Sequence, residues 1–260
     1  MALMDMEIKE LEALLKDLGQ PAFRAGQLFT WLAKGVSLDE MSNLPLGLRQ
    51  ELKKISLGGA EIYSRLVSKL DGTRKYLFSL TDGNIIEGVL MKYNYGNTLC
   101  VSSQVGCRMG CAFCASTLDG LVRNLAPGEM YGQITSVNNE LRSEGERLIS
   151  HVVVMGSGEP LENFDNLIKF LRLINSPDGL NIGMRNISVS TCGLADRIEE
   201  LARLKLGVTL SISLHAPEDE LRRRIIPVAN KYPLERLMEA AKYYIHETGR
   251  RVIFEYILLN

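Results

Sequence analysis

Three cysteines within eight residues give the strongest chemical signal of the chain. The run Gly106-Cys107-Arg108-Met109-Gly110-Cys111-Ala112-Phe113-Cys114 has the spacing Cys-x3-Cys-x2-Cys and follows a predicted strand. Three thiolates on one short loop can hold three irons of a cubic [4Fe–4S] cluster and leave the fourth iron without a protein ligand. An open metal position is typical of a catalytic site. A zinc site and buried free thiols are the alternatives, although no fourth Cys or His lies near.

A second candidate loop follows an apolar stretch at residues 151–155. It reads Met155-Gly156-Ser157-Gly158-Glu159-Pro160. Parallel α/β folds place ligands at the carboxyl ends of strands, where glycines let the backbone approach the ligand. Glu159 can accept hydrogen bonds from an ammonium group. An ordinary turn between strand and helix would explain the same residues, so this loop alone is a weak indication.

Strands and helices that would position these loops alternate from about residue 98. The predicted strands are 98–104, 151–155, 186–190, 208–214 and 252–258, and the predicted helices are 127–147, 163–174, 194–204 and 234–246. This alternation predicts parallel βα units, arranged as a barrel or as an open doubly wound sheet.

The first 95 residues have a different pattern. Apolar residues recur at three- and four-residue steps from Ile8 to Leu18, and Ser37 with Glu40 forms a capping-box pattern, so the first 55 residues read as helical. Between 61 and 92, turn signals at Asp71-Gly72 and Asp82-Gly83-Asn84 separate three β-like runs. We therefore predict a helical domain at 1–58, an antiparallel β extension at 59–95 and an α/β domain at 96–260.

Composition narrows the class of protein. The chain has 260 residues, of which 46% are hydrophobic, and its 30 basic and 31 acidic residues give a net charge of −1. These values exclude a disordered chain and a polycationic tail. No apolar stretch reaches the roughly 18 residues of a membrane-spanning helix, and the start lacks the features of a signal peptide. The five cysteines are a poor disulfide framework, so we expect a reducing compartment, the cytoplasm.

Together the two loops resemble the radical S-adenosylmethionine superfamily. Further segments are similar to the dual-specificity RNA adenine-C2 methyltransferases, the RlmN family, and occur in the right order along nearly the whole chain. They are Asp71-Gly72-Thr73, Ile86-Glu87, the segment from Thr98 to Cys107, Arg123-Asn124-Leu125, Ser190-Thr191-Cys192-Gly193 and Ser213-Leu214-His215-Ala216-Pro217. The resemblance implies a partial (β/α)6 barrel after a helical, RNA-facing accessory domain.

The resemblance also implies roles for individual residues. Cys107, Cys111 and Cys114 would hold the [4Fe–4S] cluster, and Gly158, Glu159, Ser190, Ser213, Leu214 and His215 would line the S-adenosylmethionine site. Glu87 would match the family's proton acceptor, and Cys100 the cysteine that helps resolve a covalent protein–RNA intermediate. From the residues alone, Ser190 and Ser213 could simply end strands, and His215 could be a satisfied core histidine. Cys100 could likewise be a buried thiol, and Cys192 reads as structural.

In the family, the cluster reduces S-adenosylmethionine to a 5′-deoxyadenosyl radical, which activates a methyl group carried on a protein cysteine. That carbon then adds to C2 of an adenosine in 23S rRNA or in the anticodon loop of some tRNAs. The implied partners are these two RNAs and an electron donor such as flavodoxin. A monomer that does not enter the membrane is expected. Basic residues at Arg222-Arg223-Arg224 could position phosphates or form a solvated helix face.

The sequence departs from the family pattern at its C-terminal end. The family's methyl-carrying cysteine, an asparagine ligand of S-adenosylmethionine and the sixth strand all follow the fifth strand, and this sequence stops there. We therefore expect a piece of a family member that lacks the last strand and does not methylate RNA alone. The alternatives in function are the sibling enzyme that methylates adenosine C8 and confers antibiotic resistance, a radical activase or small-molecule radical enzyme, and a zinc-stabilised RNA-binding module.

Overall fold

The computed structural model describes residues 1–258, so the last two residues of the predicted α/β domain lie outside the described residues. Internal contacts divide the chain into two compact units. The first unit comprises Met1–Leu99, Ala126–Ser150 and Ile168–Ile182, and the second comprises Cys100–Leu125, His151–Leu167 and Gly183–Asn260. These units are discontinuous in sequence, and the predicted domain boundaries near residues 58 and 95 remain a prediction.

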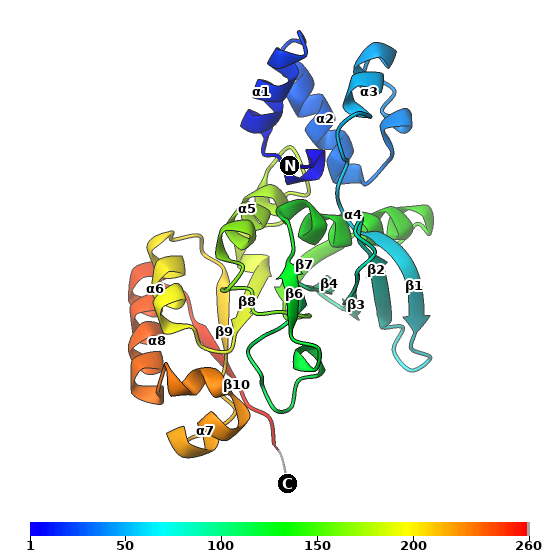
Figure 1. Cartoon of the computed structure of the whole chain (residues 1–260). Helices are drawn as coiled ribbons and strands as arrows, with labels where there is room; N and C mark the ends of the chain where they lie inside the picture. The colour runs from blue at the N-terminus through cyan, green and yellow to red at the C-terminus, as the bar shows by residue number, and fades with distance from the viewer. Residues whose placement is uncertain (259–260) are drawn as a thin grey trace. The chain divides into compact units, whose positions relative to one another are not determined.

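The first unit contains the helices of the N-terminal region and one helix from the middle of the chain. They are α1 (Ile8–Asp17), α2 (Phe23–Lys34), α3 (Leu46–Leu52) and α4 (Pro127–Ser143) (Figure 1). The predicted capping box is confirmed, because the Glu40 carboxylate accepts hydrogen bonds from the Ser37 amide at 2.9 Å and from its hydroxyl at 2.7 Å. Within residues 1–258, no helix has the length and apolarity needed to cross a membrane.

An antiparallel meander follows α3 in the chain, as predicted. It consists of β1 (Glu61–Val67), β2 (Arg74–Ser79) and β3 (Ile85–Tyr93), with β2 paired to both neighbours. In β2 the side chains alternate, so that Tyr76 and Phe78 are fully buried while Lys75 is exposed. Period-two alternation of this kind is what a sheet with one covered face requires.

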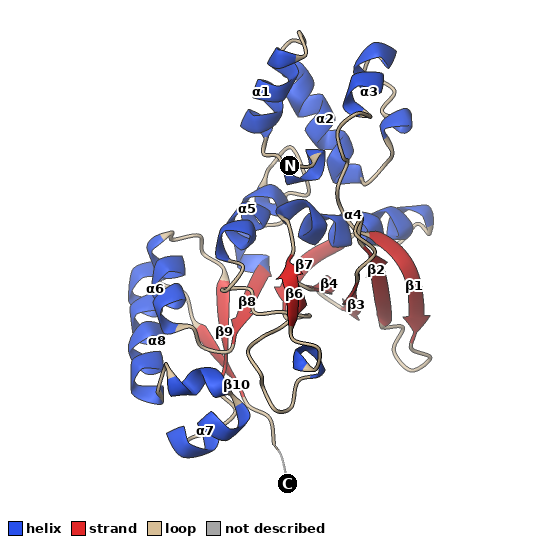
Figure 2. Cartoon of the chain, viewed as in Figure 1, coloured by secondary structure: helices blue, strands red, loops and turns tan. Residues whose placement is uncertain are grey.

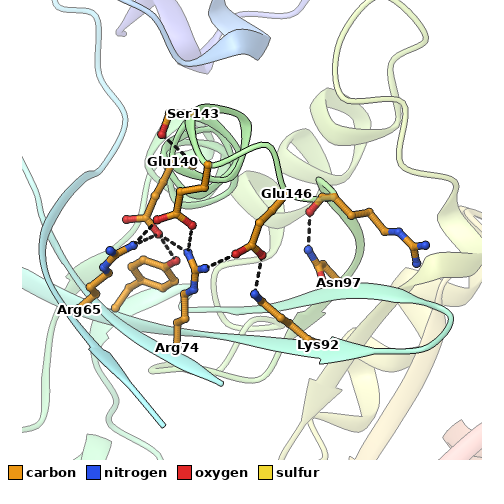
Figure 3. A network of polar contacts seen from close by, with 10 residues as sticks. Arg65, Arg74, Lys92, Asn97, Glu140, Ser143 and Glu146 are labelled. Atoms are coloured by element: carbon orange, nitrogen blue, oxygen red, sulfur yellow. Dashed lines mark hydrogen bonds and ion pairs between the residues drawn. The ribbon is translucent and has the colours of Figure 1, made fainter. Parts of the chain in front are cut away.

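A network of charges joins this meander to the end of α4 (Figure 3). The buried Arg74 guanidinium contacts carboxylate oxygens of Glu140, Glu144 and Glu146 at 2.8, 2.7 and 2.6 Å. The Tyr76 hydroxyl donates to Glu140 at 2.6 Å, and Lys92 pairs with Glu146. Because Arg74 is the cation shared by three carboxylates, it holds the sheet and the helix end together.

We expect Arg74→Met to lower the free energy of unfolding by about 1–2 kcal/mol, because three carboxylates lose their shared cation. The effect stays below that of a fully buried pair because the carboxylates are 18–30% exposed and water can reach them. Urea unfolding followed by circular dichroism measures the change. As a control, Lys54→Met breaks only an exposed pair with Glu51 and should cost less than about 0.5 kcal/mol. Equal effects of the two substitutions would show that the network adds no stability.

Parallel strands form the framework of the second unit. The strand β7 (Ile149–Val154) pairs with β8 (Ile187–Thr191), β8 with β9 (Thr209–Ser213), and β9 with β10 (Val252–Glu255), all in parallel. Their spatial order follows their order in the chain. A doubly wound sheet reverses its strand order at a switch point, whereas barrel strands follow one another, so this stretch is built like part of a barrel. The predicted α/β class is confirmed.

Helices connect these strands, as predicted (Figure 2). They are α5 (Phe164–Asn175), α6 (Ala195–Arg203), α7 (Asp219–Ile225) and α8 (Leu234–Thr248), of which α6 and α8 lie side by side. The sequence analysis missed α7, which is too short to show a helical period. It also made two strands too long, because β10 ends at Glu255 and β4 (Gly96–Val101) ends before Ser102.

Candidate active site

A small hairpin carries the three-cysteine loop. The strands β5 (Gln104–Gly106) and β6 (Leu121–Asn124) pair in antiparallel fashion and enclose residues 107–120. The Cys107 amide donates to the Gly120 carbonyl oxygen at 3.0 Å and so closes the base of the loop. Strands of three and four residues are too short to be predicted from periodicity, so this hairpin was also missed.

Gly106 is needed at the base of this loop for a steric reason. It has φ +73°, and a Cβ added there would lie 2.0 Å from the Gly120 carbonyl oxygen. Gly120 has nearly the same φ, +70°, but open space where its Cβ would be. Backbone strain alone is therefore common to both positions, whereas the clash exists only at Gly106.

We expect Gly106→Ala to reduce iron incorporation strongly, because the loop base must open to relieve the clash. Gly120→Ala is the matched control and should retain most of the iron, since it adds only the strain of a positive φ. Iron per chain after anaerobic reconstitution measures both. Equal iron contents in the two variants would show that the closed loop base is not required to hold the metal.

The loop after β7 is bound to the chain segment that leads into β5. The Ser157 carbonyl oxygen accepts hydrogen bonds from the Ser103 and Gln104 amides, and the Glu159 amide donates to the Gln104 side chain at 2.8 Å. Gly158 has φ +106°, and a Cβ there would lie 2.6 Å from the Gln104 Cβ. This close approach explains the glycine at this position.

Glu159 is a buried carboxylate at the centre of the site. It accepts hydrogen bonds from the Cys192 amide at 2.8 Å and from the Leu161 amide at 3.0 Å. Burial raises the pKa of Glu159, while these two backbone bonds act in the opposite direction. Both of these contacts are with backbone amides, and no Lys, Arg or His of the described residues pairs with the Glu159 carboxylate. A ligand with an ammonium group would therefore supply the cation that this carboxylate lacks.

One cavity of about 260 Å³ brings most of the predicted site residues together. Its lining includes the predicted residues Cys107, Cys111, Cys114, Gly158, Glu159, Ser190, Ser213 and His215. Leu214 and Cys100 are not among the lining residues in the described part of the chain. Glu87 belongs to the first unit, where its carboxylate pairs with Lys75 at 2.6 Å on β2. The roles predicted for Glu87 and Cys100 remain predictions.

Glu255 also lines this cavity, and the sequence analysis did not select it. Its carboxylate accepts hydrogen bonds from the Ser190 and Ser213 hydroxyls at 3.3 and 3.4 Å. Its carbonyl oxygen accepts bonds from the Leu214 and His215 amides. The sequence does contain one indication of this role, an acidic residue at the carboxyl end of a predicted parallel strand. Ligands of such folds bind at that edge of the sheet.

His215 is both a hydrogen-bonded residue of the fold and a lining residue of the cavity, the two roles that the sequence left open. Its Nδ1 accepts a hydrogen bond from the Ile257 amide at 3.1 Å, so one ring nitrogen is satisfied within the fold. Its ring packs edge-on against Phe113 at 4.8 Å between centroids and also lines the cavity. Burial lowers the pKa of His215, which favours the neutral ring that this acceptor role requires.

The three thiols line one cavity, which is the arrangement that a cubane cluster requires of its ligands. A cubane takes each thiolate on a different iron, so the thiols must surround one space and need not converge on one point. In residues 1–258 no three His, Cys, Asp or Glu side chains are placed to share a single metal ion. Burial raises the pKa of Cys107 and raises that of Cys111 to about 12, so metal binding must displace protons.

Comparison with known proteins agrees with this site. Two family models match the chain: the radical SAM superfamily over residues 101–260, and the N-terminal domain of ribosomal RNA large subunit methyltransferases over residues 1–57. The crystal structure of a radical SAM methyltransferase from Sphaerobacter thermophilus is similar with a TM-score of 0.95 and 42% identity, covering 100% of this chain and 77% of that one. The chain therefore has the fold and the loop of the radical SAM superfamily, whose members use a [4Fe–4S] cluster and S-adenosylmethionine.

Curated relatives show to which family within this superfamily the chain belongs. A probable dual-specificity RNA methyltransferase RlmN of Lachnospira eligens is 54% identical over 257 residues, which are 96% of this chain and 71% of the relative. The protein of the same description from Alkaliphilus oremlandii is 52% identical over 260 residues, 99% of this chain and 75% of the relative. This chain belongs to the RlmN family of the radical SAM superfamily.

Proposed function

We propose that this protein is a radical S-adenosylmethionine RNA methyltransferase that modifies C2 of an adenosine in 23S rRNA and in the anticodon loop of some tRNAs. Membership of the RlmN family supports the substrate class. The observation that carries the proposal is the cavity itself, in which three thiols face Glu159 and the hydroxyls at the ends of β8 and β9. When bound, the cluster and S-adenosylmethionine supply the one-electron chemistry that an unactivated sp2 carbon needs.

Each residue of the proposed site has a separate role. Cys107, Cys111 and Cys114 would hold the cluster and leave one iron open. Glu159 would accept hydrogen bonds from the amino group of S-adenosylmethionine. The hydroxyls of Ser190 and Ser213, held by Glu255, would orient the rest of that molecule together with Gly158, Leu214 and His215. Glu87 would accept the proton from C2, and Cys100 would help release the protein from the RNA.

The proposed partners follow from the same chemistry. The reaction needs a one-electron donor, and a flavodoxin-type protein is the proposed source. We propose action as a monomer in the cytoplasm, where both RNAs occur.

Reductive cleavage of S-adenosylmethionine tests the proposed chemistry. The anaerobically reconstituted chain is incubated with S-adenosylmethionine and dithionite, and 5′-deoxyadenosine is measured by mass spectrometry. We expect its formation, and we expect the chain to retain unmodified 23S rRNA fragments and tRNA in preference to DNA of the same sequence. A loaded cluster without any cleavage would contradict the radical chemistry, and equal retention of DNA would contradict the RNA substrate.

Nucleoside analysis distinguishes the sibling activity. Because the chain covers 71% of the Lachnospira eligens relative, this test uses a chain extended to the full length of the relatives. Digestion of 23S rRNA modified by that extended chain should release 2-methyladenosine. Release of 8-methyladenosine would overturn the C2 assignment in favour of C8.

A further inference from the structure

Arg222 is a fully buried guanidinium that the proposed function leaves without a task. It lies in α7 and has 0% of its surface exposed, so it is neither a phosphate contact nor part of a solvated face, as the sequence analysis supposed for this triplet. Its Nη2 donates to the carbonyl oxygens of Cys192 at 2.7 Å and Ser213 at 3.3 Å. Its Nε donates to the Leu214 carbonyl oxygen at 3.2 Å.

Among the described residues this guanidinium forms no direct ion pair, and the charge of Asp219 acts on it only from beyond salt-bridge distance. All its protein partners are neutral carbonyl oxygens, and its Nη1 is buried without a hydrogen-bond partner. The nearest acidic residue along the helix, Asp219, instead accepts a hydrogen bond from the Leu234 amide. Burial lowers the pKa of Arg222, but a guanidinium remains charged in proteins. A buried cation is costly unless an anion lies close, so an anion nearer than Asp219 would lower the cost of burying Arg222.

The cavity of the three thiols lies next to this cation. The residue whose carbonyl oxygen Arg222 binds, Cys192, lines the cavity and packs with Cys111 and Ile226 in one buried cluster. The Ala112 amide donates to the Ile225 carbonyl oxygen at 2.9 Å, which fastens the cysteine loop to the end of α7. The helix that carries the cation is thus bound directly to the loop that would hold the metal.

A cubane cluster held by the three thiolates would supply such an anion. Its oxidised core carries two positive charges against three from the thiolates, so the assembly is negative, and one-electron reduction adds another negative charge. A fixed neighbouring cation stabilises the more negative state more strongly. Charge and hydrogen bonds near a cluster are the means by which a protein sets its reduction potential.

We propose that Arg222 is a positioning residue that raises the reduction potential of the cluster through its buried positive charge. This inference rests on the proposed function, because it requires the cluster. In the reduction step one electron passes from an external low-potential donor to the cluster, the donor is oxidised by one electron, and no bond or proton is exchanged. The guanidinium also forms hydrogen bonds to carbonyl oxygens at the carboxyl ends of both β8 and β9. Those bonds require hydrogen-bond donors but no positive charge.

Two substitutions separate the effect of the Arg222 charge from the effect of its hydrogen bonds. Arg222→Gln removes the charge and keeps amide donors, whereas Arg222→Lys keeps the charge and loses the guanidinium fork. The control Arg224→Gln removes an exposed charge from the same helix, where Arg224 pairs with Glu220 at 2.5 Å. Each protein is reconstituted anaerobically, and the midpoint potential is measured by dithionite titration followed by electron paramagnetic resonance, together with iron per chain.

For Arg222→Gln we expect the equilibrium constant for reduction to fall about tenfold, a shift of about 59 mV to more negative potential. Arg222→Lys should stay within about a third of that shift, and Arg224→Gln should match the parent protein. Equal potentials for the Gln variant and the parent would overturn the proposal, as would equal shifts in the Gln and Lys variants, which would indicate a role in packing alone.

Failure of this inference is distinguishable from failure of the proposed function. A parent protein that binds no iron would sink the proposed function, whereas a loaded parent with an unchanged Gln variant would sink only the role of Arg222. If the Arg222→Gln variant binds no iron, the Arg222→Lys variant provides the test. An iron-loaded Lys variant with the midpoint potential of the parent supports the role of the positive charge. A clearly lowered potential in that variant contradicts it.

Discussion

Alanine in place of Cys107, Cys111 or Cys114 is expected to abolish the iron–sulfur cluster. In the proposed site each thiolate would be the only protein ligand of its iron, so two remaining thiolates would leave the cubane without a stable attachment. The three residues line one cavity, and no other loop of the described chain offers three thiols. Iron content, acid-labile sulfide and the visible absorbance of the reconstituted variants measure the loss.

The same cavity provides the control for this prediction. Cys192 lines it and is buried beside Cys111, yet its place at the end of β8 is outside the loop that holds the other three. We therefore expect Cys192→Ala to retain the cluster. Full iron content in any of the three loop variants would refute that residue's assignment as a ligand. Loss of iron in Cys192→Ala would show that Cys192 is also required to hold the cluster.

Replacing Glu159 by alanine is expected to weaken binding of S-adenosylmethionine and leave the cluster in place. A charge-assisted hydrogen bond contributes roughly 1.5–3 kcal/mol, so the affinity should fall by about one to two decades. The buried carboxylate also holds the amides of Cys192 and Leu161, so part of the loss could come from the loops. Equilibrium titration with S-adenosylmethionine, alongside iron per chain, separates ligand binding from metal loading.

Two further variants isolate the charge of Glu159. Glu159→Gln removes the charge and keeps one of the two acceptor oxygens, so either the Cys192 or the Leu161 amide loses its bond. It should show most of the same loss of affinity. Glu162→Gln is the matched control, since Glu162 lies three residues on, pairs with Arg108 at 2.5 Å and is absent from the described cavity lining. An unchanged affinity in Glu159→Gln would mean that the carboxylate does not bind the amino group.

Elements long enough to show a period could be predicted from the sequence. The meander β1–β3 and the helices α1, α2, α4 and α8 were found because apolar residues repeat and turn residues separate them. The hairpin β5–β6 and the helix α7 span too few residues to show any repeat, and their formation depends on tertiary contacts such as the bond between Ala112 and Ile225.

The candidate site was predictable where residue type and spacing carry the chemistry. The cysteine loop was identified in this way, whereas Glu159 needed the family resemblance as well, and the structure places both around one cavity. Arg222 could not be told from Arg223 and Arg224, because three consecutive arginines differ only in which of them faces the interior of the fold. Glu255 was missed because its importance lies in its contacts with Ser190 and Ser213, which come from two other strands.

The metal content of the purified protein tests the central claim most directly. Protein prepared under anaerobic conditions and reconstituted with iron and sulfide is analysed for iron, acid-labile sulfide and zinc. We predict a brown protein with about four irons and four sulfides per chain and a visible iron–sulfur band. A colourless protein that binds stoichiometric zinc and retains no sulfide would contradict the account and would support a zinc-stabilised RNA-binding module instead.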